Sequence, residues 1–196
     1  MGTLVSLHVP QTLPPTTFTD GPLDVRKANL REIPSLLALI NSFAAKGIML
    51  PRTEFELAEN IRDFVVIGHG ERLLACCALH IYSPTSAEIR SLAVDPGWQS
   101  HGLGRKMVAA LEQDAREFGI VSLFAFTYVE GFFRKLGYET VERGELPLKA
   151  WKDCLRCPKF QACDEIAMRK RLNEYHSCEG IATPQMRVFK KHGTAI

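Results

Sequence analysis

The stretch SLAVDPGWQSHGLGRKMV, residues 91–108, places a glycine-bearing loop between an apolar strand and a helix. The strand stops at Asp95-Pro96-Gly97, and the helix opens at Gly104-Arg105. A helix N-terminus carries about half a positive charge and leaves its first N–H groups unpaired. Glycine also allows a ligand to approach the backbone closely. The loop that begins at Gln99 therefore has the features of an anion-binding cradle.

The same loop also fits an ordinary strand-to-helix connection in which glycine serves only the turn geometry. Two common phosphate-binding motifs are excluded. No Gly-Lys-Ser/Thr ends the loop, as it would in a P-loop. Gly102-Leu103-Gly104 lacks the third glycine of the dinucleotide fingerprint. The spacing alone leaves the cradle and the plain connection both open.

The segment CLRCPKFQACDE, residues 154–165, is a second group of residues that could do chemistry. Cys154 and Cys157 have the Cys-x-x-Cys spacing that forms half of a common zinc site, and Cys163 is a third thiol nearby. Cys178 or His176 could supply a fourth ligand. The full spacing matches no standard zinc or iron–sulfur pattern. Reduced thiols in a lid over the substrate also fit, so a structural zinc is considered and no metal ligand is assigned.

Hydrophobic periodicity predicts the elements that must position these residues. Residues 30–46 have apolar side chains at helical spacing, and Gly47 ends that helix. The remaining expected helices are 55–61, 105–118 and 131–138, and the expected strands or extended pieces are 23–27, 63–68, 72–82, 87–94, 122–128 and 138–143. Adjacent Cys76 and Cys77 should point to opposite faces of their strand, and one of them should have a buried packing role. This order predicts an α+β, or α/β-like, domain with a mixed sheet.

The length of 196 residues and the 46% hydrophobic content suffice for one sizeable core. We expect a flexible leader at 1–22 and one domain at 23–171. Its last part, 147–171, is cysteine-rich, and 172–196 reads as a polar tail.

Composition excludes several classes of function. A net charge of +2 is too small to make nucleic acid the main partner. No apolar run approaches the length of about 18 residues that a membrane span needs, and the amino terminus does not have the pattern of a secretion signal. Six cysteines without such a signal fit a reducing compartment. The expectation is a cytoplasmic protein with no membrane partner, and a homodimer is left open.

The wider setting of the loop resembles a known family. QSHGLG, residues 99–104, is similar to the Gln/Arg-x-x-Gly-x-Gly/Ala segment of the Gcn5-related N-acetyltransferases (GNAT). The run LAVDP before it and FFRKLGY at 132–138 resemble the segments that flank this motif in the family. The resemblance covers about residues 23–143, with the segments in the expected order. It implies the GNAT fold, in which a mixed sheet is splayed at the cofactor site.

The family resemblance implies acetyl-coenzyme A as co-substrate. The loop and the following helix would hold its pyrophosphate, and the helix at 132–138 would support the thiol arm. The backbone N–H of Val94 would donate to the thioester oxygen. The cofactor-binding residues carried over are Leu92, Val94, Gln99, Ser100, His101, Gly102, Leu103, Gly104, Arg105, Phe132 and Phe133.

Glu88 is the candidate general base, because it lies on the strand leading to the loop and matches the family's glutamate there. The alternative is a surface ion pair of Glu88 with Arg90 or a neighbouring lysine. Strict strand alternation assigns the side chains to two faces: Glu88, Arg90, Leu92 and Val94 on one, and Ile89, Ser91 and Ala93 on the other. Where relatives have a tyrosine as acid, this chain has Phe133; Tyr138 and Tyr128 are nearby alternatives.

Within the family, the chain looks most like the acetyltransferase domain of amino-acid N-acetyltransferases, the N-acetylglutamate synthases of arginine biosynthesis. Segments such as KGIMLPRT, residues 46–53, support this. It resembles a short stand-alone form without the arginine-sensing kinase domain. L-Glutamate would need cationic clamps. Arg52 is the first candidate, and Lys46, Arg156 and Lys159 are the others.

Two rival functions remain open at this stage. An enzyme of the same fold could acetylate another amine, such as a protein N-terminus. A non-catalytic module could instead bind acetyl-coenzyme A, or a metal through its cysteines, and regulate a partner.

Overall fold

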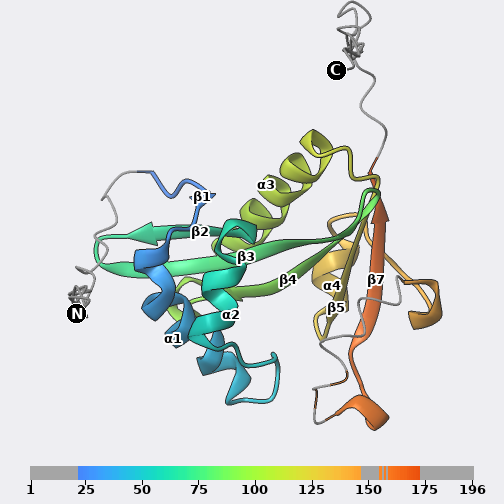
Figure 1. The fold of residues 1–196 in the computed structure, drawn as a ribbon, viewed down its shortest axis with the longest axis horizontal. Coiled ribbons are helices and arrows are strands. Elements are labelled where there is room, and N and C mark those ends of the chain that lie inside the picture. The colour runs from blue at the N-terminus through green and yellow to red at the C-terminus, as the bar shows by residue number, and fades with distance from the viewer. Residues whose placement is uncertain (1–21, 147–154, 156, 158, 173–196) are drawn as a thin grey trace, which may run out of the picture.

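One open mixed sheet organises the part of the chain that the computed structural model describes: residues 22–146, 155, 157 and 159–172 (Figure 1). Its strand order is β1-β2-β3-β4-β5-β7-β6. The bounds are Arg26–Lys27 for β1, Phe64–His69 for β2, Arg72–Ser83 for β3, Ser86–Val94 for β4, Ser122–Thr127 for β5, Glu139–Thr140 for β6 and Ile166–Arg171 for β7. β4 and β5 run parallel and the other pairs antiparallel. The predicted mixed sheet is confirmed.

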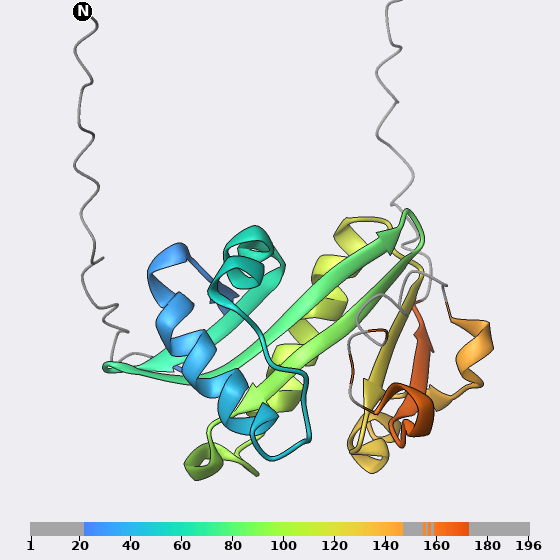
Figure 2. The same ribbon diagram turned by 60° about the horizontal axis from the view of Figure 1, so that its bottom comes forward.

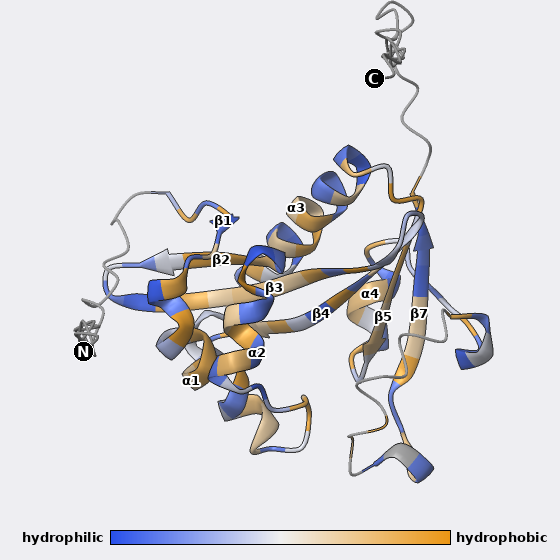
Figure 3. Cartoon of the chain, in the orientation of Figure 1, coloured by the Kyte–Doolittle hydropathy of each residue, from blue (hydrophilic) through white to orange (hydrophobic). Residues whose placement is uncertain are grey.

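Helices cover both faces of this sheet. α1 (Ile33–Ala44) and α2 (Glu54–Glu59) lie on one face, and α3 (Leu103–Glu117) and α4 (Glu130–Arg134) lie on the other (Figure 1). The apolar residues of α3 line its sheet-facing side, while its outer side is hydrophilic (Figure 3). No helix among the described residues combines the length and apolar character that crossing a membrane requires.

Two apolar cores, one on each face, explain the alternation along β3. Cys76 packs in the core beneath α1, and Cys77 packs in the core beneath α3. The predicted opposite faces are confirmed, and both side chains are fully buried, whereas the sequence indicated a packing role for one of them. Burial raises the pKa of Cys76 to about 12, so this thiol is inert packing.

A β-bulge at Ser91 reverses the predicted alternation in the second half of β4. Cys76 pairs with Ala93 and Ala78 pairs with Arg90, so Ser91 and Leu92 together lie opposite one residue of β3. Ser91 has a φ of 54°, in the left-handed region. Leu92 and Val94 consequently pack on the α3 face. The predicted common face for Glu88, Arg90, Leu92 and Val94 is wrong. The extra residue reverses the face of the sheet to which the side chains after it point.

The parallel pairing of β4 and β5 is short. It begins at Ser86 and Ser122 and ends at Glu88 and Phe124. Beyond these residues β4 continues to Val94 beside β3, while β5 continues to Thr127 beside β7. Figure 2 shows the two strands together at one end and apart at the other. The sheet is therefore splayed at its centre.

The sequence reading missed β7, which lies between β5 and β6. Lys170 of β7 donates to both carboxylate oxygens of Glu112 on α3, at 2.7 and 2.8 Å. It also donates to the Leu136 carbonyl at 2.8 Å. Leu172, expected in the tail, is buried and donates its backbone N–H to the Val121 carbonyl. The packed structure thus extends through Leu172.

We predict that Lys170→Met destabilises the fold by about 2–4 kcal/mol, because it leaves the buried Glu112 carboxylate without its main donor. Urea denaturation measures this loss. The matched control is Lys27→Met, which removes a more exposed ion pair with Asp114 and should cost less than about 1 kcal/mol. Equal losses of stability in the two variants would contradict the stabilising role of the Lys170–Glu112 contact between β7 and α3.

Candidate active site

The loop before α3 is held in place by its own contacts. Asp95 accepts the Gly97 N–H at 2.9 Å, Gln99 donates to the Val94 carbonyl at 3.3 Å, and the His101 ring contacts the Gln99 carbonyl at 2.8 Å. Ser100 adopts a left-handed φ of 66°. These contacts fix the backbone path from the end of β4 into α3.

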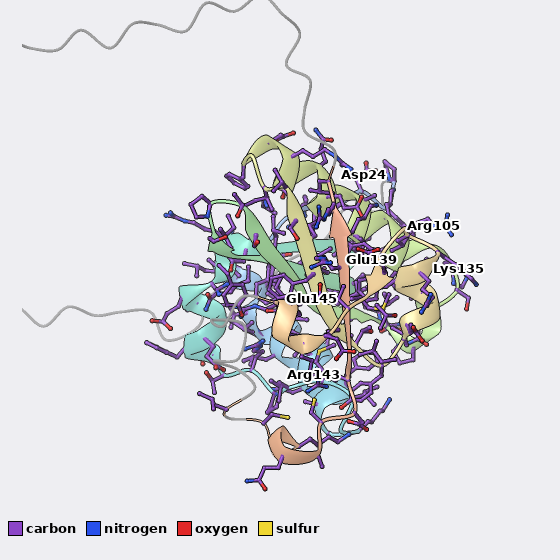
Figure 4. All side chains as sticks on the ribbon, turned by 90° about the vertical axis from the view of Figure 1, so that its right-hand side faces the viewer. Asp24, Arg105, Lys135, Glu139, Arg143 and Glu145 are labelled. Carbon is purple, nitrogen blue, oxygen red and sulfur yellow. The ribbon has the colours of Figure 1, made fainter. Side chains whose placement is uncertain are left out.

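The first turn of α3 presents unused backbone donors. The first helical hydrogen bond is donated by Lys106 N to the Gly102 carbonyl at 3.0 Å, so the N–H groups of Leu103, Gly104 and Arg105 have no acceptor within the helix. The Leu103 side chain is buried in the core, which leaves only its backbone for a ligand. Arg105 and Lys135 project at the same outer edge of the molecule (Figure 4) and add positive charge there.

The two glycines of the loop serve different purposes. Gly102 has a φ of 80°, and a Cβ there would meet nothing within 4 Å, so it provides the turn and leaves open space. A Cβ on Gly104 would instead lie 3.3 Å from Cζ of Phe132. Gly104 therefore lets the helix start pack directly on the Phe132 ring. That contact joins α3 to α4.

The backbone N–H of Val94 points away from β3. Asp95 N donates to the Leu74 carbonyl at 2.7 Å, and successive N–H groups along a strand point in opposite directions. The Val94 N–H is therefore directed toward β5, at a level where the pairing of β4 with β5 has already ended. The geometry leaves this donor available in the splay.

Glu88 lies at the last paired level of β4 and β5 and is 8% exposed. The Tyr82 hydroxyl donates to its Oε2 at 2.9 Å. The Tyr82 ring packs against Phe124 of β5, with centroids 5.7 Å apart. A buried carboxylate thus stands at the point of the splay, oriented from β3.

A pocket of about 430 Å³ opens beside this carboxylate, on the α1 and α2 face. Arg52 lines one wall, and its backbone is fixed by two hydrogen bonds with the side chain of Asn41, at 2.9 and 3.0 Å. Arg90 of β4 lines the pocket as well, together with Tyr82 and His80. Arg52 and Arg90 therefore line the same pocket as Tyr82, the residue that orients Glu88, and the lining also includes Glu56 and Glu59. The sequence analysis considered Arg90 only as an ion-pair partner for Glu88 and did not predict its place in the pocket lining.

The other predicted clamps do not join this pocket within the described residues. Lys46 is exposed and lies over the Phe43 ring, 5.4 Å from its centroid. The Lys159 ammonium contacts Asp164 at 3.3 Å and the Tyr128 hydroxyl at 3.1 Å. Arg156 lies outside the described residues.

The two tyrosines near the splay differ in their surroundings. Tyr138 packs on Phe133 in the core, with ring centroids 5.2 Å apart, and burial raises its pKa strongly. Such a buried phenol is a poor proton donor for a solvent-facing thiolate. Burial also raises the pKa of Tyr128, whose hydroxyl donates to Asp164 at 3.0 Å.

The cysteine-rich segment lies partly outside the described residues, which leave out Cys154, Cys178 and His176. Cys157 and Cys163 are free thiols. Arg143 donates to the Cys163 sulfur at 3.0 Å and to the carbonyls of Cys163 and Glu165. Among the residues that the structure describes, no three His, Cys, Asp or Glu side chains gather as a metal site.

A splayed mixed sheet with a donor-rich loop at its opening is the architecture of an acyl-coenzyme A-dependent transferase. The acetyltransferase (GNAT) family model matches residues 35–138, and the chain belongs to this family. It is an acetyl-coenzyme A-dependent N-acetyltransferase.

Two sequence relatives support this assignment. An uncharacterized N-acetyltransferase of Chlorobaculum tepidum is 40% identical over 148 residues, which cover 76% of this chain and 96% of the relative. An amino-acid acetyltransferase of Mycobacterium tuberculosis is 32% identical over 132 residues, covering 64% and 75% of the two chains.

A solved structure with the same fold is the N-acetylglutamate synthase of Neisseria gonorrhoeae, complexed with coenzyme A and N-acetyl-glutamate. The TM-score is 0.71 and the identity 30%. The match covers 77% of this chain but 35% of the synthase chain.

We predict that Gly104→Ala raises the KM for acetyl-coenzyme A by about tenfold, because a contact of 3.3 Å with Phe132 displaces the helix start. Steady-state kinetics with acetyl-coenzyme A varied would measure it. Gly144→Ala is the matched control, since a Cβ there meets nothing within 4 Å. A parental KM in Gly104→Ala would show that the close contact does not shape the cofactor site.

Proposed function

We propose that this acetyltransferase transfers the acetyl group of acetyl-coenzyme A to the α-amine of L-glutamate, the first step of arginine biosynthesis. The observation that carries the proposal is the pocket that Arg52 and Arg90 both line, from different parts of the chain, together with Tyr82, which holds Glu88. Guanidinium groups bind carboxylates through paired N–H donors. Two of them suit an acceptor that carries two carboxylates.

Comparison with relatives supports the same acceptor. The Mycobacterium relative is named an amino-acid acetyltransferase, and the Neisseria synthase was crystallised with coenzyme A and N-acetyl-glutamate. The Chlorobaculum relative, which is more similar in sequence, has no assigned acceptor.

The cofactor would enter the splay between β4 and β5. Its pyrophosphate would meet the N–H groups of the Gln99–Gly104 loop and the α3 start, and its thioester oxygen would accept the Val94 N–H. Phe132 would support the thiol arm from α4. Of these donors, the Val94 N–H lies beyond the paired part of β4 and β5, and the others belong to the loop and to the first turn of α3.

The acceptor amine must lose a proton before it attacks the thioester carbon. In the proposed reaction the ammonium gives that proton to Glu88, directly or through a water. The amine nitrogen then forms a bond to the carbonyl carbon, and the C–S bond breaks without a covalent enzyme intermediate. A thiolate is a tolerable leaving group, so the reaction does not depend on a strong acid such as Tyr138.

A screen of amino acids and peptides for acetyl-coenzyme A-dependent thiol release tests the function. Glutamate should give the highest kcat/KM, because both carboxylates would be held. A preference for peptide N-termini would favour the rival amine acceptor, and the absence of release with any amine would favour a non-catalytic binding module.

We predict that Glu88→Gln lowers kcat about 100-fold at neutral pH, because an amide cannot accept the proton. Activity should recover in part as pH rises, since more of the acceptor is then neutral. Glu117→Gln on the outer side of α3 is the control and should keep parental activity. An unchanged pH–rate profile in Glu88→Gln would remove this carboxylate from the mechanism.

We predict that Arg52→Ala and Arg90→Ala each raise the KM for glutamate about ten- to a hundredfold, as expected for loss of a charge-assisted contact made in the ground state. Arg52→Lys should recover only part of the loss, because an ammonium cannot form the paired N–H bonds that a guanidinium makes to a carboxylate. The KM for acetyl-coenzyme A should stay near the parental value. Arg31→Ala, at an exposed position outside the pocket, is the control. Parental glutamate KM values in both pocket variants would refute the clamp.

A further inference from the structure

His80 and Asp63 form a pair at the pocket that the reaction described above does not use. His80 Nδ1 lies 2.8 Å from Asp63 Oδ2. Both side chains are partly exposed, at 27% and 28%. An ionised carboxylate can only accept hydrogen bonds, so a neutral His80 donates from Nδ1 to Asp63. Its Nε2 is then left as a proton acceptor.

The same histidine is a direct neighbour of the candidate base. His80 of β3 lies opposite Glu88 of β4 in the strand register, and opposed residues have Cβ atoms about 4.5–5.5 Å apart. The His80 ring also packs edge-on against the Tyr82 ring, with centroids 4.8 Å apart, and the Tyr82 hydroxyl holds Glu88. His80 is thus linked to Glu88 by strand register and, through Tyr82, by a ring contact and a hydrogen bond.

His80 and Glu88 differ in access to solvent. Glu88 is 8% exposed and is not among the residues that line the pocket, whereas His80 lines it. A carboxyl group buried in this way cannot readily return a proton to bulk water, yet it must be ionised again before the next turnover. A histidine with an oriented ring can carry the proton across that gap.

We propose that His80, positioned by Asp63, receives the acceptor's proton from Glu88 and releases it to the solvent of the pocket. This inference rests on the proposed acyl transfer, with Glu88 as base, and adds a catalytic role for His80 and a positioning role for Asp63. It does not depend on which amine is the acceptor.

The proton balance of the cycle is complete. The ammonium loses one proton to Glu88, and that proton passes to His80 Nε2 and then to water. The amine nitrogen loses its second proton as the amide forms, and the departing thiolate takes up one proton. The net products are the N-acetyl compound, free coenzyme A and one released proton, so no oxidant or further reactant is needed.

A double-mutant cycle tests the relay. We expect His80→Gln to lower kcat about 10- to 100-fold with the KM for acetyl-coenzyme A unchanged, and Asp63→Asn to lower kcat less. Because the relay acts after Glu88, His80→Gln should cause no further loss in the Glu88→Gln background. Parental kcat in His80→Gln, or losses that multiply in the double variant, would overturn the relay. Asp114→Asn, which removes an ion pair on α3, controls for loss of a surface aspartate.

A second measurement needs no acceptor. Nitrogen-detected NMR of the folded protein at about pH 9, where free histidine is neutral, reports the tautomer of His80, assigned by its loss in His80→Gln. We expect the proton on Nδ1 in the parent and a mixed population in Asp63→Asn. A parent with the proton on Nε2 would overturn the relay even if no acceptor is turned over. An inactive parent with the expected tautomer would contradict the proposed function alone.

Discussion

The end of β4–β5 pairing at Glu88 and Phe124 is the constraint on which the site depends. Up to this level the two strands satisfy each other's backbone groups. Beyond it, β4 stays with β3 and β5 stays with β7. The facing N–H groups of β4 are consequently left for a ligand, which would be costly if the gap were dry and empty. In the proposed function, acetyl-coenzyme A would supply the acceptors for these backbone groups.

The bulge at Ser91 gives this opening its chemistry. Before the bulge, Arg90 lines the polar pocket and Glu88 lies buried behind it, held by Tyr82; after the bulge, Leu92 and Val94 pack in the apolar layer of α3 and α4. In the proposed reaction, β4 would serve the acceptor from one face of the sheet and support the cofactor loop from the other. An unbroken strand would place all four side chains on the same face. The left-handed φ of Ser91 is thus part of the bulge that gives the two faces of the sheet different side chains.

Much of the fold was predictable from the sequence because its signals are local. The glycine loop and the apolar period of α3 indicated the strand–loop–helix unit. Arg52 became a candidate only through the resemblance of its loop to the synthases. The bulge was not predictable, since a serine carries no signal for positive φ. β7 was missed because IAMRKR is half basic, and its charges are satisfied only by distant partners, such as Glu112 for Lys170 and Glu145 for Arg169. The position of Arg90 and His80 in one pocket was not predictable, because it depends on how β3, β4 and α2 pack together.

The position of β7 has a consequence for how the chain reaches this state during synthesis. β5 pairs with a strand that begins about forty residues later, and β6, made earlier than β7, has only β7 as its partner in the described sheet. Until Arg171 has left the ribosome, the outer edge of β5 is an unpaired template for another chain. Closing this long-range contact is intrinsically slow. A nascent chain would therefore complete half of the sheet early and depend on shielding of the β5 edge until its last strand arrives.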